Sequence, residues 1–244
     1  MSKVAVIIPA AGRSERFGEG ESKTLAKIDG RAVFLRTLEH FVNREDVIQT
    51  ILVVAGKEKE QVRSKYGPNL GFMGVQLVEG GDERADSVAA GLETVKDEAE
   101  LVAIHDAARP CVSIRMIDDV FAEAAKTGAA ILAAPITATI KRVSKAGVID
   151  TTVPRESLFE AQTPQVFRRQ LIIDAYANRP TEGEPITDDA QLVEAAGHPV
   201  SIVQSNHTNL KITTKADTTL AKAILKARPQ KTAPGLGAFE EAQW

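Results

Sequence analysis

The strongest constraint on the fold is a repeated switch between short apolar runs and segments with helical spacing. Lys3–Pro9, Val47–Ala55 and Leu101–Ile104 are rich in Val, Ile and Leu without polar alternation, which is typical of strands buried on both faces. Helical spacing lies between them, as in Ala32–Phe41 and about Ala85–Val95. This β–α–β–α order predicts a parallel sheet with right-handed crossovers and helices on both faces.

The same alternation continues almost to the end of the chain. We therefore expect one Rossmann-like α/β domain over residues 1–227, with a mostly parallel twisted sheet flanked by helices, and a loosely attached extension over residues 228–244. The further strands are predicted at Val75–Val78, Ala129–Ala134 and Val200–Val203, and the further helices at Glu58–Tyr66, Ile114–Lys126, Arg168–Ala177, Asp188–Ala196 and Lys215–Ala227.

A different pattern follows Pro135. Thr139–Val143 and Val148–Val153 alternate in polarity around Ser144-Lys145-Ala146-Gly147, which predicts a β-hairpin. Because a two-stranded ribbon is marginally stable by itself, we expect this arm, at about residues 137–156, to lie on its own domain or to embrace a second subunit.

The composition excludes several classes of protein. With a net charge of −3 the chain lacks the basic field of a nucleic-acid coat. Its single cysteine, Cys111, excludes an internal disulfide and a cysteine-cluster metal site. No apolar run approaches the roughly 20 residues that span a bilayer, and the first strand begins too early to leave room for a signal peptide. We expect a cytoplasmic protein that binds neither nucleic acid nor membrane.

The loop after the first strand is the first candidate site. Ala10, Ala11 and Gly12 are small enough for a ligand to approach the backbone closely, and Arg16 and Lys23 add two cations suited to a polyphosphate. Neither the dinucleotide fingerprint nor the Gly-Lys-Ser/Thr phosphate loop is present. An ordinary loop with solvated charges is the alternative.

A second candidate follows the strand at Val75–Val78. Gly81 permits close backbone approach, and Ser87 offers a hydroxyl on the first turn of the next helix, which suits a ribose or a base edge. The alternative is a plain helix start with Asp82 as its cap.

The third candidate follows Leu101–Ile104. Asp106 suits a ribose hydroxyl, a substrate hydroxyl or Mg²⁺, although Asp106 and Arg109 are equally compatible with a simple ion pair. For His105 we favour a structural hydrogen-bonding role over that of a general base. All three segments follow strands of one parallel sheet, whose carboxyl ends are where ligands bind, so a shared site is the better interpretation.

Three further polar residues occur late in the chain. Arg155 and Lys211 are suited to a second anion, but spacing alone favours solvated surface cations. Thr187 belongs to Thr187-Asp188-Asp189-Ala190, which helix capping explains adequately.

Taken together and in order, these segments resemble the 2-C-methyl-D-erythritol 4-phosphate cytidylyltransferase family. The resemblance spans about residues 3–226 and includes Gln162-Thr163-Pro164-Gln165 and Asn209-Leu210-Lys211-Ile212-Thr213. It implies that CTP and 2-C-methyl-D-erythritol 4-phosphate give the CDP-linked alcohol and pyrophosphate. This is a step of the non-mevalonate route to isoprenoids.

The resemblance also implies roles for individual residues. Arg16 and Lys23 would stabilise the charge on the reacting phosphates, and Mg²⁺ would be bound mainly through the CTP phosphates, without a protein metal site. The hairpin would clasp a second subunit in a homodimer, with Thr187 reaching the partner's acceptor site. The implied nucleotide-binding residues are Ala10, Ala11, Gly12, Gly81, Asp82 and Ser87, and the implied acceptor-binding residues are Asp106, Arg109, Arg155, Thr187 and Lys211.

Three other functions compete with this prediction. A cytidylyltransferase for another alditol phosphate, such as ribitol 5-phosphate, would share the nucleotide half of the site. A nicotinamide-dependent oxidoreductase would need the glycine fingerprint and an acidic residue after the second strand, where Ala55-Gly56-Lys57 supplies neither. A non-catalytic nucleotide-binding regulator would tolerate loss of Arg16 and Lys23, yet both are present.

Overall fold

Seven strands form one sheet in the order β11-β7-β10-β6-β1-β4-β5. The computed structural model describes residues 2–11, 17, 23–81, 83–180 and 186–228. The sheet is mostly parallel, as predicted, with β1 between β4 and β6, β5 beside β4, and β11 beside β7. The bounds of these strands are Val4–Pro9 for β1, Val47–Ala55 for β4, Val75–Gly80 for β5, Leu101–Ile104 for β6, Ala129–Pro135 for β7 and Ser201–Gln204 for β11.

One central strand, β10 (Phe159–Arg168), is absent from the sequence prediction. It lies between β6 and β7 and runs antiparallel to both. The polar residues Gln162, Thr163 and Gln165 interrupt its apolar pattern, which is why the sequence indicates a polar patch between elements. The structure instead buries all three of these side chains within the strand.

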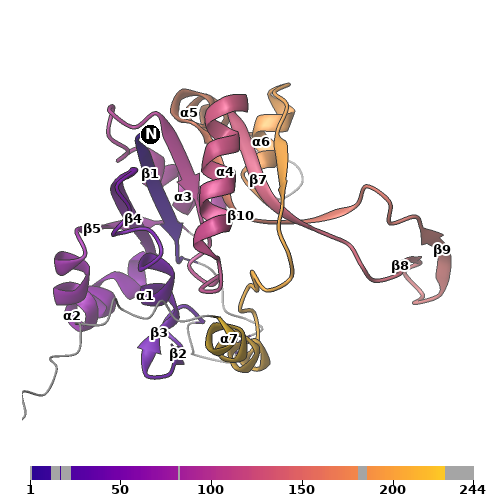
Figure 1. Cartoon of the computed structure of the whole chain (residues 1–244), viewed down its shortest axis with the longest axis horizontal. Coiled ribbons are helices and arrows are strands. Elements are labelled where there is room, and N and C mark those ends of the chain that lie inside the picture. The colour runs from indigo at the N-terminus through magenta and orange to yellow at the C-terminus, as the bar shows by residue number, and fades with distance from the viewer. Residues whose placement is uncertain (1, 12–16, 18–22, 82, 181–185, 229–244) are drawn as a thin grey trace, which may run out of the picture.

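Helices cover both faces of the sheet (Figure 1). The side chains of β1 alternate between two core clusters. Val6 and Ile8 belong to the first cluster, and Ala5 and Ile7 belong to the second. Fully burying one such isoleucine stabilises the fold by about 1.5–3 kcal/mol. The helices that pack in the first cluster are α1 (Val33–Leu38), α2 (Gly56–Phe72) and α4 (Ile114–Thr127). Those that pack in the second are α3 (Arg84–Leu92), α5 (Arg169–Ala177) and α6 (Ala190–Ala195).

The last helix, α7 (Lys215–Ala227), lies near the carboxyl ends of the strands, beside the small hairpin of β2 (Lys27–Ile28) and β3 (Arg31–Ala32) (Figure 1). A capping box fixes its start, because Asp217 Oδ2 accepts the Thr214 N–H at 2.7 Å. Ala221 of α7 belongs to a third core cluster with Ile28 and Ile212. Among the described helices, none combines the length and hydropathy needed to cross a membrane.

The predicted hairpin is confirmed as an arm that projects from the body (Figure 1). Its strands, β8 (Ile140–Val143) and β9 (Ile149–Val153), form a separate antiparallel sheet. The turn has Gly147 at a φ of 77°, a conformation that favours glycine. Val148 and Ile149 expose 63% and 59% of their surface, so the arm leaves apolar side chains uncovered within one chain.

Candidate active site

An open cleft lies at the carboxyl edge of the sheet. The residues after β1, Ala10 and Ala11, form one wall, and the turn after β6 forms another. Four of the lining side chains are charged: Lys23, Arg84, Asp106 and Lys211. The structure therefore joins segments from both ends of the sequence, at the place where ligands bind in parallel sheets.

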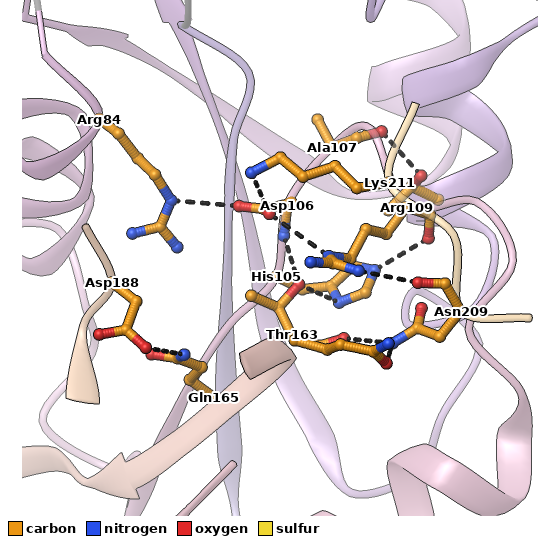
Figure 2. A network of polar contacts seen from close by, with 12 residues as sticks. Arg84, His105, Asp106, Ala107, Arg109, Thr163, Gln165, Asp188, Asn209 and Lys211 are labelled. Carbon is orange, nitrogen blue, oxygen red and sulfur yellow. Dashed lines mark hydrogen bonds and ion pairs between the residues drawn. The ribbon is translucent and has the colours of Figure 1, made fainter. Parts of the chain in front are cut away.

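The Asp106 carboxylate lies among three cations (Figure 2). Its Oδ1 lies 3.1 Å from Arg84 Nε, and its Oδ2 lies 2.8 Å from Lys211 Nζ and 3.5 Å from Arg109 Nε. Burial alone would raise the pKa of Asp106, but the charges of Lys211, Arg84 and Arg109 outweigh it and hold the pKa well below its usual value. Asp106 is therefore ionised at neutral pH.

His105 is linked to Asp106 through the Thr163 hydroxyl. Its Nε2 lies 3.1 Å from the Arg109 carbonyl oxygen, which can only accept, so Nε2 carries the proton. Its Nδ1 then accepts from the Thr163 hydroxyl at 3.1 Å, and Thr163 Oγ1 in turn accepts the Asp106 N–H at 3.0 Å. Burial lowers the pKa of His105 to about 3, so the ring stays neutral. This geometry agrees with the structural role favoured for His105.

Arg109 is buried beneath the cleft and does not line it in the part of the chain that is described. Its guanidinium donates to the Asn209 carbonyl oxygen at 2.8 Å. Asn209 Nδ2 donates to Gln162 Oε1 at 3.0 Å and to the Thr163 carbonyl oxygen at 2.9 Å. These bonds tie the segment before α7 to β10, and that segment carries Lys211 into the cleft.

Arg84 is a lining residue for which the sequence analysis predicted no role. Its Nε faces Asp106, while its two terminal nitrogens bind Asp189 at 3.0 and 2.7 Å. Burial alone would lower the pKa of Arg84, but the carboxylates of Asp189 and Asp106 raise it well above its usual value. The sequence signal that could have indicated a role for Arg84 is a cation in the first turn of a helix that begins just after a strand ends.

The structure describes four of the six predicted nucleotide-binding residues: Ala10, Ala11, Gly81 and Ser87. The N–H groups of Ala10 and Ala11 donate to the Val53 carbonyl oxygen at 2.7 and 3.2 Å, so these residues offer small side chains and close approach rather than N–H donors. Ser87 is buried, and its hydroxyl donates to the Glu83 carbonyl oxygen at 3.1 Å. A Cβ on Gly81 would lie 2.5 Å from Asp86 Cβ, so this backbone requires glycine.

Three of the predicted residues, Gly12, Arg16 and Asp82, lie outside the described residues. The N-cap of α3 is Glu83, so the alternative that assigned this position to Asp82 is wrong.

Besides Arg109, two predicted acceptor-binding residues do not line the described cleft of their own chain. Arg155 lies at the base of the arm and donates to the Thr137 carbonyl oxygen. The Thr187 N–H and hydroxyl donate to Gln191 Oε1 at 2.9 and 3.2 Å.

The described residues contain no group of three or more His, Cys, Asp or Glu side chains that could hold a metal. Asp106 is the one carboxylate among the described residues that line the cleft. A metal bound here would therefore need most of its ligands from a substrate and from water.

Clustered cations and one buried carboxylate, placed beside a loop of small residues at the carboxyl edge of a doubly wound sheet, are features of a nucleotidyltransferase. Residues 4–227 match the sequence profile of the 2-C-methyl-D-erythritol 4-phosphate cytidylyltransferase family, and the chain belongs to this family.

Individual relatives agree with this assignment. The chain is 43% identical over 235 residues to the 2-C-methyl-D-erythritol 4-phosphate cytidylyltransferase of Rhodopirellula baltica, covering 92% of this chain and 95% of the relative. It is 39% identical to the enzyme of the same name from Bacillus licheniformis, covering 91% and 95%. The crystal structure of the Thermus thermophilus enzyme superposes with a TM-score of 0.76 at 33% identity, covering 92% of this chain and 99% of that one.

Proposed function

We propose that this enzyme transfers the cytidylyl group of CTP to 2-C-methyl-D-erythritol 4-phosphate and releases pyrophosphate, in the non-mevalonate route to isoprenoids. The observation that carries the proposal is the cleft in which Lys23, Arg84 and Lys211 surround one opening next to Ala10 and Ala11. Family membership supplies the identity of the two substrates.

In this mechanism an oxygen of the acceptor phosphate attacks the α-phosphorus of CTP in line. A new P–O bond forms to the acceptor as the bond to the β-phosphate oxygen breaks, and the electron pair leaves with pyrophosphate. A phosphate monoester is already largely a dianion at neutral pH, since its second pKa is about 6. No general base is therefore required, which fits a neutral, buried His105.

The chain accelerates this step by positioning and by charge. Lys23 lines the cleft and would neutralise the negative charge that builds on the α-phosphate and the leaving group, together with Arg16 by family resemblance. Lys211 would hold the acceptor phosphate, and Asp106 orients Lys211 through their 2.8 Å contact. Arg109 would act on the acceptor through Asp106, because it is buried behind that carboxylate.

Mg²⁺ is part of the proposal as a companion of CTP. We expect it to be bound mainly through the CTP phosphates, because the described lining carboxylate, Asp106, already pairs with Arg84, Arg109 and Lys211. When bound, Mg²⁺ would neutralise phosphate charge.

The cytoplasmic location expected from the sequence stays a prediction.

We further propose a homodimer joined through the arm. Its support is the set of exposed apolar side chains on and beside the arm, Val143, Val148, Ile149 and Phe159, and the position of Arg155 away from its own chain's cleft. Light scattering after gel filtration should give twice the mass of 26.2 kDa for the wild type and the monomer mass for Ile149→Glu. Leu220→Glu on α7, similarly exposed, is the matched control and should stay dimeric. A monomeric wild type would contradict the proposal.

The activity is tested by pyrophosphate release with CTP and Mg²⁺, using methylerythritol phosphate and ribitol 5-phosphate separately. We expect release with methylerythritol phosphate, and a loss of about 10²–10³-fold in turnover for Lys23→Ala, by analogy with the loss of one oxyanion donor. Lys126→Ala is the control, because Lys126 lies outside the described cleft and pairs with Glu123 at the surface. Release with ribitol 5-phosphate alone would assign a different acceptor. Silence with both acceptors despite CTP binding would favour a regulator.

A further inference from the structure

Asp189 is a fully buried carboxylate that the mechanism above does not use. It occupies the N-cap position of α6, but its side chain forms no capping hydrogen bond. The Asp188 side chain does so instead, accepting the Gln191 N–H at 3.1 Å. Capping, which the sequence suggested for this segment, therefore does not explain why a carboxylate is buried at position 189.

The partners of Asp189 lead into the cleft. Its two carboxylate oxygens bind the two terminal nitrogens of Arg84, at 3.0 and 2.7 Å, while Arg84 Nε lies 3.1 Å from Asp106 Oδ1. A guanidinium is planar and rigid. When a carboxylate binds both of its terminal nitrogens, the direction of its Nε–H is therefore fixed as well. Asp189 thereby determines how Arg84 meets Asp106.

Asp189 is itself held from two other elements. The Tyr176 hydroxyl of α5 donates to Asp189 Oδ1 at 2.5 Å. Burial, with the adjacent charge of Asp189, raises the pKa of Tyr176, so the hydroxyl remains a donor at neutral pH. From β10, Gln165 Oε1 accepts the N–H groups of Asp189 and Ala190, both at 3.0 Å.

Loss of this support would change the contacts around Asp106. The Arg84 side chain is 23% exposed and could then turn its fork toward the Asp106 carboxylate. There it would compete with Lys211, whose Nζ binds the other oxygen of Asp106. Lys211 would lose the contact that directs it toward the acceptor phosphate.

We propose that Asp189 and Tyr176 are positioning residues for acceptor binding: they fix Arg84, and through Arg84 the Asp106 carboxylate and Lys211. This inference rests on the proposed function, since it concerns the acceptor half of that site. It extends the working part of the site to α5 and the start of α6, neither of which lines the described cleft.

The first test compares Tyr176→Phe and Asp189→Asn with two matched controls. Tyr66→Phe removes another buried tyrosine hydroxyl, one that has no hydrogen-bond partner among the described residues. Asp46→Asn breaks another bidentate Arg–Asp pair, in which Arg44 donates at 2.9 and 2.7 Å just before the amino end of β4. We expect KM for the acceptor to rise about tenfold in Tyr176→Phe and more in Asp189→Asn, as for a lost hydrogen bond to a charged group. KM for CTP should not change, and the controls should keep both KM values.

A second readout needs no substrate. In the full chain labelled with ¹⁵N-arginine, the Arg84 Nε–H resonance, assigned with Arg84→Lys, should exchange with water slowly in the wild type. It should exchange at least about tenfold faster in Asp189→Asn, because a freed guanidinium is more accessible to solvent. Unchanged exchange, or an equal rise in both KM values, would overturn the positioning role. An inactive wild type would instead overturn the proposed function.

Discussion

Replacing Asp106 by Asn should cost stability as well as activity, because it removes the negative charge shared by three cations. Breaking a buried ion pair by neutralising one partner typically costs about 3–5 kcal/mol. Lys211 is 36% exposed and can turn toward water, and Arg84 keeps Asp189. Arg109, 6% exposed, is the cation left buried, so we expect the lower end, about 3 kcal/mol.

For a chain of this size, 1 kcal/mol corresponds to about 2–4 °C in Tm. Asp106→Asn should therefore melt about 6–12 °C below the wild type in a phosphate-free scan. Added pyrophosphate should raise the Tm of the variant more than that of the wild type, because the cleft of the variant is more positive and binds anions more tightly.

Asp97→Asn is the control for this experiment, since Asp97 is exposed and pairs with Arg169 at the surface, where ion pairs contribute little. An Asp106→Asn variant that melts within about 2 °C of the wild type, on the same size scaling, would refute the reasoning. So would equal losses in the two variants.

Two further predictions concern stability. The folded chain holds His105 neutral down to a pKa of about 3, whereas the unfolded chain binds its proton below about 6.5. Stability contributed by this histidine is thus lost as pH falls from about 6.5 to about 3, at about 1.4 kcal/mol per pH unit. Urea titrations across this range should show a slope shallower by that amount in His105→Gln, and equal slopes would contradict the assignment. Gly91→Ala would place a Cβ 2.7 Å from Ile7 Cγ2 and should cost about 1–3 kcal/mol. Gly71→Ala in α2 meets nothing within 4 Å and should gain about 0.5–1 kcal/mol; urea midpoints that move together would refute the packing argument.

The elements predicted best from the sequence are those with one uniform pattern. The strands at Val47–Ala55 and Leu101–Ile104 and the helix at Lys215–Ala227 match the structure at both ends. Burial on two faces produces a mostly apolar run, and a helix with a capping box has a clear start.

The missed strand β10 has a physical reason. Its buried polar side chains are satisfied by groups far along the chain: Gln162 by Ser205 and Asn209, and Gln165 by the 188–190 segment. No local pattern records partners that only the fold brings together. Buried polar groups then look like surface residues in the sequence.

The residues of the candidate site also fall into two sets: those that a local sequence pattern indicates and those whose role depends on contacts made by the fold. Asp106 and Lys23 were found because each follows a strand in a recognisable segment, and both line the cleft. The roles of Arg84, Asp189 and Tyr176 were missed, because their meaning depends on contacts between α3, α5 and the start of α6.

The most direct test of the account is to identify the product when both acceptors compete. Wild-type enzyme, CTP and Mg²⁺ are mixed with equal concentrations of methylerythritol phosphate and ribitol 5-phosphate, and the products are resolved by mass spectrometry. The account predicts the CDP-linked methylerythritol, formed in equal amount with pyrophosphate. Predominant CDP-ribitol, or CTP that stays intact with both acceptors present, would contradict it.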